Sequence, residues 1–147
     1  MQLNGEFEAT VDAKSRFLLP GGIKKQLPEG ENRFIISRGL DKCLSLYPLK
    51  NWEKIVADIS SLNQFDPKVR AFRRQFIGGA TEVELDSAGR LLLPGSLKEY
   101  AGIAKDIVLS SAFTHFEIWD ETSYKQLFSD ITPEMFSQLA NEVMKPQ

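Results

Sequence analysis

The sequence of 147 residues is poor in the side chains that build disulfides and metal sites. It has one cysteine, Cys43, and one histidine, His115. A single cysteine cannot form an internal disulfide, and neither residue has a second Cys or His at the spacing of a zinc site. We therefore expect no metal and no other cofactor, with Cys43 acting as a small hydrophobic side chain.

Long apolar runs and targeting signals are also missing. Runs such as the one at 17–19 are far shorter than the roughly 18 apolar residues that a membrane helix needs. The start, MQLNGEFEAT, contains two acidic residues and no apolar segment of the kind found in signal peptides. These features predict a cytoplasmic protein without a membrane partner.

Motifs of catalysis are absent as well. The chain has no Gly-x-Ser-x-Gly and no Walker-type phosphate loop. Asp12 and Asp86 could be imagined as a carboxylate pair, but each is followed by an arginine four positions later. Without a positioned base, nucleophile or metal, the sequence predicts that the protein is not an enzyme and takes no small-molecule substrate.

The chain does contain an internal repeat. "DAKSRFLLPGG" begins at Asp12, and "DSAGRLLLPGS" begins at Asp86, 74 residues later. Each copy follows an alternating apolar–polar stretch and reads as strand, turn and returning strand, which predicts a β-hairpin ended by Pro-Gly. A short helix, two strands and a longer helix are expected to follow in both halves, so that one unit occurs twice.

Several helix boundaries can also be read from the sequence. The pairs Asp66-Pro67 and Thr132-Pro133 have the form of an N-cap followed by proline at the first helical position. Ser96 and Glu99 have the spacing of a capping box. We expect a first unit with its helix at 5–62, a connecting basic helix at 63–79, a second unit with its helix at 80–129, and a C-terminal helix or tail at 130–147.

The doubled Asp-x-x-x-Arg with its apolar-x-Pro, "DAKSRFLLP" and "DSAGRLLLP", resembles the MraZ family of bacterial transcriptional regulators. The segments "LSLYPLKNWEKI" and "FEIWDETSYKQL" resemble it too. The resemblance implies an α+β fold, mainly β, in which two tandem swapped-hairpin (AbrB-like) units form one pseudo-twofold barrel with peripheral helices. It further implies a ring-like homo-oligomer that binds double-stranded DNA at promoter repeats of the division and cell-wall gene cluster, and hence a nucleoid-associated protein.

Basic side chains at the hairpin tips are the candidate DNA contacts: Lys14 and Arg16 in the first copy, and Arg90 in the second. Arginine suits bidentate contact with phosphate or a guanine edge. The alternative for each arginine is an ion pair with the aspartate of its own turn. We assign Asp12 and Asp86 to the turns, as side chains that hold the neighbouring arginine in place.

This sequence departs from the family pattern at two positions of the hairpin tips. Ser15 stands where glycine is usual, and Ala88 stands where lysine is usual, so we expect the tips to differ in shape and in contact with DNA.

The charge of the chain favours binding by several copies together. The net charge is −2, and one copy offers contacts to about one to three phosphates, whereas a salt-resistant complex commonly needs about six to ten. Secondary candidates for DNA contact are Arg70, Arg73 and Arg74 on the connecting helix. The alternative function is an oligomeric protein-interaction module, like the antitoxin relatives of this fold, without direct DNA readout.

Overall fold

The computed structural model describes residues 2–145. The last two residues of the tail predicted at 130–147 lie outside the described residues. The first half contains strands β1 (Glu6–Thr10) and β2 (Arg16–Leu18), helix α1 (Gly21–Lys24), strands β3 (Arg33–Arg38) and β4 (Leu44–Pro48), and helices α2 (Leu49–Ser60) and α3 (Pro67–Phe76). The second half contains β5 (Thr81–Glu84), β6 (Arg90–Leu92), α4 (Gly95–Tyr100), β7 (Asp106–Ser111), β8 (Phe116–Asp120), α5 (Glu121–Gln126) and α6 (Pro133–Val143).

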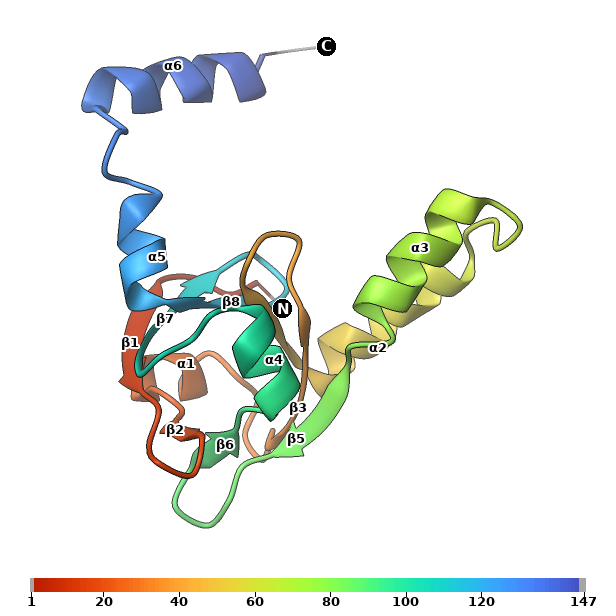
Figure 1. The fold of residues 1–147 in the computed structure, drawn as a ribbon, viewed down its shortest axis with the longest axis vertical. Coiled ribbons are helices and arrows are strands. Elements are labelled where there is room, and N and C mark those ends of the chain that lie inside the picture. Colours follow the sequence, from red (N-terminus) through yellow and green to blue (C-terminus); the bar gives the residue numbers. More distant parts are fainter. Residues whose placement is uncertain (1, 146–147) are drawn as a thin grey trace.

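The architecture is mixed α+β, as predicted, and the same order of elements occurs in both halves (Figure 1). One sheet has six strands in the order β1-β7-β8-β4-β3-β5, and a second has two strands, β2 and β6. When each strand is exchanged with its counterpart in the other half (β1 with β5, β3 with β7, β4 with β8), the result is the same strand order read from the opposite edge of the sheet. The topology therefore has the twofold symmetry of the repeat.

The symmetry extends to single residues. Phe7 pairs with Leu109 between β1 and β7, and the counterparts Thr81 and Ile36 pair between β5 and β3. The first strand of each half thus pairs with the third strand of the other half. The β-hairpin predicted within each half was therefore wrong as a strand pairing: the turn forms, but β1 pairs with β7, β5 pairs with β3, and β2 pairs with β6. This exchange ties the two halves into one unit that neither half can complete alone.

One hydrophobic core joins the two sheets. It contains Phe17 and Leu91 from the two-stranded sheet together with Phe34, Ile107 and Ile118 from the six-stranded sheet, all at most 1 % exposed. The strand alternation that the sequence shows places these side chains inward because successive residues point to opposite faces. Burial of this shared core holds the short strands β2 and β6 against the larger sheet.

Helices α2 and α3 form a hairpin that covers a second aromatic cluster. Trp52 packs against Tyr47 and Phe76, with ring centroids 5.3 and 5.2 Å apart. In the second half, Trp119 and Tyr124 form a smaller cluster under α5. These aromatic rings are core residues in both halves, so they are not available for stacking on bases.

The helix N-termini agree with the sequence in two cases and differ in one. Asp66 and Thr132 cap α3 and α6 through their side chains, each followed by proline, as predicted. The capping box at Ser96 was wrong. Lys98 N already donates to Pro94 O, so α4 begins at Gly95, and Ser96 lies inside the helix where its hydroxyl cannot cap the first turn.

Helix α6 stands away from the sheets at the end of the α5 segment (Figure 1). Between Pro133 and Val143 only Ala140 is even partly buried. No helix within residues 2–145 has the length and apolar content needed to cross a bilayer.

Candidate nucleic-acid interface

The first hairpin turn is built on Asp12. Its Oδ1 accepts hydrogen bonds from the backbone N–H groups of Lys14 and Arg16 at 2.9 and 3.0 Å. The backbone N–H of Ser15 donates to Asp12 O at 3.0 Å, and Ser15 has a φ of 62°. The aspartate thus satisfies the donors of a turn whose last residue is in the left-handed region.

The second turn repeats this geometry. Asp86 Oδ1 accepts from the N–H groups of Ala88 and Arg90, both at 2.9 Å, and Gly89 has a φ of 81°. Ser15 therefore adopts the conformation for which the second copy uses glycine. The expectation that the tips differ in shape was wrong, because the bonds to the aspartate hold both turns in the same form.

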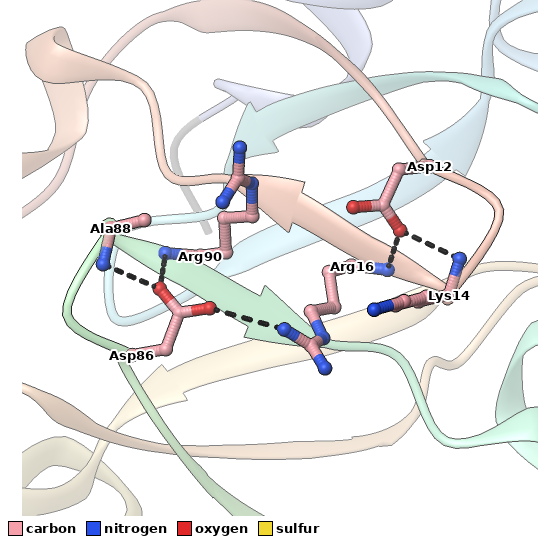
Figure 2. A network of polar contacts seen from close by, with 6 residues as sticks. All are labelled: Asp12, Lys14, Arg16, Asp86, Ala88 and Arg90. Carbon is pink, nitrogen blue, oxygen red and sulfur yellow. Dashed lines mark hydrogen bonds and ion pairs between the residues drawn. The ribbon is translucent and has the colours of Figure 1, made fainter.

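The two turns meet in one antiparallel pair of strands, which we call the ribbon (β2 with β6, residues 16–18 and 90–92; Figure 2). Arg16 lies opposite Leu92, and Leu18 lies opposite Arg90. Each turn also clasps the other strand, because Leu93 N donates to Ser15 O at 2.8 Å and Leu19 N donates to Gly89 O at 3.0 Å. We predicted two tips that contact DNA separately, whereas in the structure the residues beside both turns lie on one surface.

The ribbon is crossed by an ion pair between Arg16 Nη1 and Asp86 Oδ2 at 3.7 Å (Figure 2). The alternative prediction, an ion pair between each arginine and the aspartate of its own turn, was wrong for Arg16, since its carboxylate partner Asp86 lies in the turn of the other half. The N–H groups of Arg16 and Arg90 hold the pKa of Asp12 and of Asp86, respectively, below the usual value of 3.8. Both aspartates are therefore ionised at neutral pH.

The outer face of the ribbon contains two residues that the sequence analysis missed. Phe17 and Leu91 are buried, so their neighbours in each strand point outward, and Leu18 and Leu92 are 57 % and 50 % exposed. Together with Arg16 and Arg90 they make a surface of alternating arginine and leucine. Strand alternation could have identified both leucines, but only knowledge of the pairing shows that they share a face.

A further basic residue reaches the second turn from the first half. A side-chain Cβ at Gly89 would lie 3.4 Å from Lys24 Nζ, which places this ammonium group beside the turn that lacks a lysine at Ala88. With the exposed Lys14 and the two ribbon arginines, the surface has four basic side chains against Asp12 and Asp86. Lys24 could not be predicted from the sequence, because its position depends on how α1 packs beside the second turn.

The secondary candidates lie on a separate element. Helix α3 belongs to the α2–α3 hairpin and does not contribute to the ribbon (Figure 1). Arg70 Nη1 donates to Phe65 O at 2.7 Å, and Arg73 Nη1 donates to Gln64 Oε1 at 3.2 Å, so both brace the α2–α3 connection. Arg74 is exposed. The structure does not bring these three arginines together with Arg16 and Arg90.

His115 and Cys43, the two remaining side chains with chemical reactivity, are half-buried and buried in the protein, respectively. The imidazole of His115 stacks on Tyr47 with ring centroids 4.5 Å apart, and burial lowers its pKa to about 4. Burial raises the pKa of the Cys43 thiol to about 12. Within residues 2–145, no cluster of three or more His, Cys, Asp or Glu side chains could hold a metal ion.

In a comparison with protein families, one family model matches the chain twice, and the two matches together cover nearly all of it. The model is described as "MraZ protein, putative antitoxin-like", and it matches residues 3–75 and 76–145. The two matches fall on the two halves that repeat in the fold.

Curated relatives match over almost their full length. "Transcriptional regulator MraZ" of Christiangramia forsetii is 43 % identical, covering 98 % of this chain and 94 % of the relative. Proteins with the same name from Flavobacterium psychrophilum and Symbiobacterium thermophilum are 41 % and 39 % identical. They cover 95 % of this chain in both cases, and 90 % and 98 % of the relatives, respectively.

Proposed function

This chain belongs to the MraZ family, and from that premise we propose that it is a transcriptional regulator that binds double-stranded promoter DNA as a ring-like homo-oligomer. The DNA we propose is a set of short repeats in the promoter of the division and cell-wall gene cluster, as the family resemblance implies. The relatives are regulators by name, and the expectation that the chain is not an enzyme holds for the family.

The single observation that carries the proposal is the ribbon. The major groove of B-DNA admits a two-stranded β-ribbon, and arginine can make bidentate contacts with guanine there. Arg16 and Arg90 lie diagonally across the outer face of β2 and β6, so one groove can receive both. Leu18 and Leu92 fill the other two positions and suit apolar contact with thymine methyl groups.

The barrel of the proposed fold is supported by the shared core. Side chains of the ribbon and of the six-stranded sheet pack into one cluster, and the strand exchange between the halves has the form of swapped hairpins. We propose that the two sheets make one pseudo-twofold barrel, with the ribbon at its DNA-binding side.

The charge of one ribbon is too small for tight binding by a single copy. Four basic side chains against two aspartates leave a net charge of +2, and Arg16 already shares its charge with Asp86. About six to ten phosphate contacts are usual in a complex that resists salt. Several copies that meet adjacent repeats would supply them, which is why the proposal includes the oligomer.

The second candidate function is a protein-interaction module of the antitoxin kind. The description of the family model contains the term antitoxin-like, and α6 exposes an apolar face that a protein partner could cover. In this case the ribbon arginines would not be needed for the interaction.

DNA binding by Arg16→Ala and Arg90→Ala tests the proposal. We expect each change to weaken binding to DNA from upstream of the gene by about 10- to 100-fold, the range for loss of one bidentate base contact. Fluorescence anisotropy at fixed salt measures this affinity. Arg33→Ala is the matched control, since Arg33 is an exposed arginine in an ion pair of similar length, 3.9 Å, on β3 outside the ribbon.

The oligomer must stay intact for the result to count. Light scattering should give the same mass for both ribbon variants as for the wild type. Loss of binding with unchanged mass supports the ribbon as the DNA-binding surface. Unchanged binding in both variants contradicts it, and unchanged binding together with capture of a toxin-like partner supports the antitoxin function.

A further inference from the structure

Within residues 2–145, no other element covers the apolar face of helix α6. Phe136, Leu139 and Val143 recur at spacings of three and four residues, which places them on one side of the helix. They are 70 %, 48 % and 75 % exposed. An amphipathic helix that contacts nothing is marginal in water, because most helical stability comes from packing of the apolar face. Another surface must therefore cover α6.

The first half of the chain shows how such a helix is covered. Val69, Phe72 and Phe76 of α3 have the same spacing of three and four residues, and Phe76 packs against α2 and Tyr47. Helix α2 has 12 residues, whereas its counterpart α5 has 6. The second half therefore lacks the long helix against which α6 could fold back.

An apolar groove that could receive a helix lies along the α2–α3 hairpin. Its volume is about 320 Å3, and most of its apolar lining comes from α2, α3, β4 and the turn before β4: Leu40, Tyr47, Ile55, Ile59, Phe72 and Phe76. Leu40 stands at its edge with 83 % exposure. His115 also lines the groove and is neutral at pH 7, and the Glu117 carboxylate there accepts a hydrogen bond from Trp119 Nε1 at 3.0 Å.

The two helical segments that carry the groove and α6 have opposite net charge. Residues 49–77, which contain the hairpin, have six basic and three acidic side chains, a net charge of +3. Residues 121–145, which contain α5 and α6, have two basic and four acidic side chains, a net charge of −2. Complementary charge favours contact between these two parts of different copies, and it opposes pairing of α6 with another α6.

From these observations we propose that α6 of one copy docks in the groove on the α2–α3 hairpin of a second copy. The proposal rests on the homo-oligomer of the proposed function and assigns its interface. The helix and the groove lie on different elements that leave the sheets at different sides (Figure 1). The contact is therefore head-to-tail: the copy that supplies the helix keeps its groove free, and the copy that supplies the groove keeps its helix free. Such contacts close into a ring when the rotation between copies allows it.

Two single variants, one on each side of the interface, test the docking. Phe136→Glu places a charge on the apolar face of α6, and Leu40→Glu does so at the edge of the groove. Both residues are largely exposed, so the chain should still fold, and circular dichroism checks this. We expect each variant to fall from the mass of the oligomer to the 16.6 kDa of one chain in light scattering.

A mixture of the two variants gives the sharper result. The Phe136→Glu protein keeps an intact groove, and the Leu40→Glu protein keeps an intact α6. In a head-to-tail contact the mixture should form pairs of twice 16.6 kDa and nothing larger, because only one contact can form. The double variant with both changes in one chain should remain monomeric and should not enter the pairs.

Controls separate the interface from general effects of added charge. Gln138→Glu lies on the polar face of α6, and Phe65→Glu lies at the tip of the hairpin, where Phe65 is 90 % exposed and outside the groove. Both should keep the mass of the wild type. If Phe136→Glu and Leu40→Glu keep it as well, or if their mixture forms no pairs, the proposed docking is wrong although the regulator can still be an oligomer. A wild type that is monomeric would contradict the oligomer itself, while DNA binding by the ribbon is measured separately.

Discussion

Ser15 and Gly89 occupy equivalent places in the two turns, and both have positive φ angles, 62° and 81°. A serine in this region is strained, whereas glycine is not. We expect Ser15→Gly to raise the free energy of unfolding by about 0.5 kcal/mol and Gly89→Ala to lower it by about 1 kcal/mol. Urea denaturation at fixed protein concentration measures both changes. A shift in the same direction for both variants would contradict the shared turn geometry.

His115 should give the stability a dependence on pH. Burial lowers its pKa from 6.5 to about 4, so the unfolded chain binds the proton more readily than the folded protein between these values. Stability is therefore full above pH 6.5 and decreases as the pH falls towards about 4. His115→Phe keeps an aromatic ring against Tyr47 and should flatten the melting temperature in this range.

Asp12 and Asp86 act in a different pH range. Their pKa values are lowered from 3.8 by the backbone N–H groups of the turns, so the stability that they supply is present above pH 3.8 and is lost as the pH falls further. The loss near pH 5 should therefore be unchanged in Asp12→Asn and absent in His115→Phe. A variant of either turn that flattens the curve at pH 5 would contradict this assignment.

Among the elements, α6 and α2 differ in what covers them. Trp52 and Ile59 of α2 are buried in their own chain, whereas α6 depends on a neighbouring copy in the docking that we propose. Hydrogen exchange should show protection of both helices in the wild type. In monomeric Leu40→Glu we expect the amides of α6 to exchange at least about tenfold faster, with those of α2 unchanged. Equal protection of α6 in both proteins would mean that its own chain covers it.

The elements were largely predictable because local patterns determine them. Alternation in the strands, the caps at Asp66 and Thr132, and the repeat at Asp12 and Asp86 are written in neighbouring residues. The pairing of β2 with β6 was not predictable, because a strand of three residues carries too little pattern to determine its partner or its register. The Arg16–Asp86 pair and the place of Lys24 follow from that pairing and were missed for the same reason.

At the scale of the whole molecule, the twofold repeat and the head-to-tail contact serve different purposes. The repeat joins β2 of the first half and β6 of the second half in a ribbon within one chain. The proposed contact through α6 would place several ribbons in one assembly, each with a net charge of only +2 in its basic and acidic side chains. Tight binding would then depend on the number of copies that reach DNA together.

This dependence predicts how the monomeric variant behaves on different DNA. On DNA with several closely spaced repeats, Leu40→Glu should bind at least about 100-fold more weakly than the wild type, because the gain in effective concentration is lost. On DNA with a single repeat the two proteins should bind within a few-fold of each other, since both present the same ribbon. The slope of log K against log salt should also be steeper for the wild type on repeats, because more phosphates are neutralised. Titrations of both DNAs at several salt concentrations measure these quantities. Equal affinity of the monomer and the oligomer for the repeats would contradict binding through several weak ribbons.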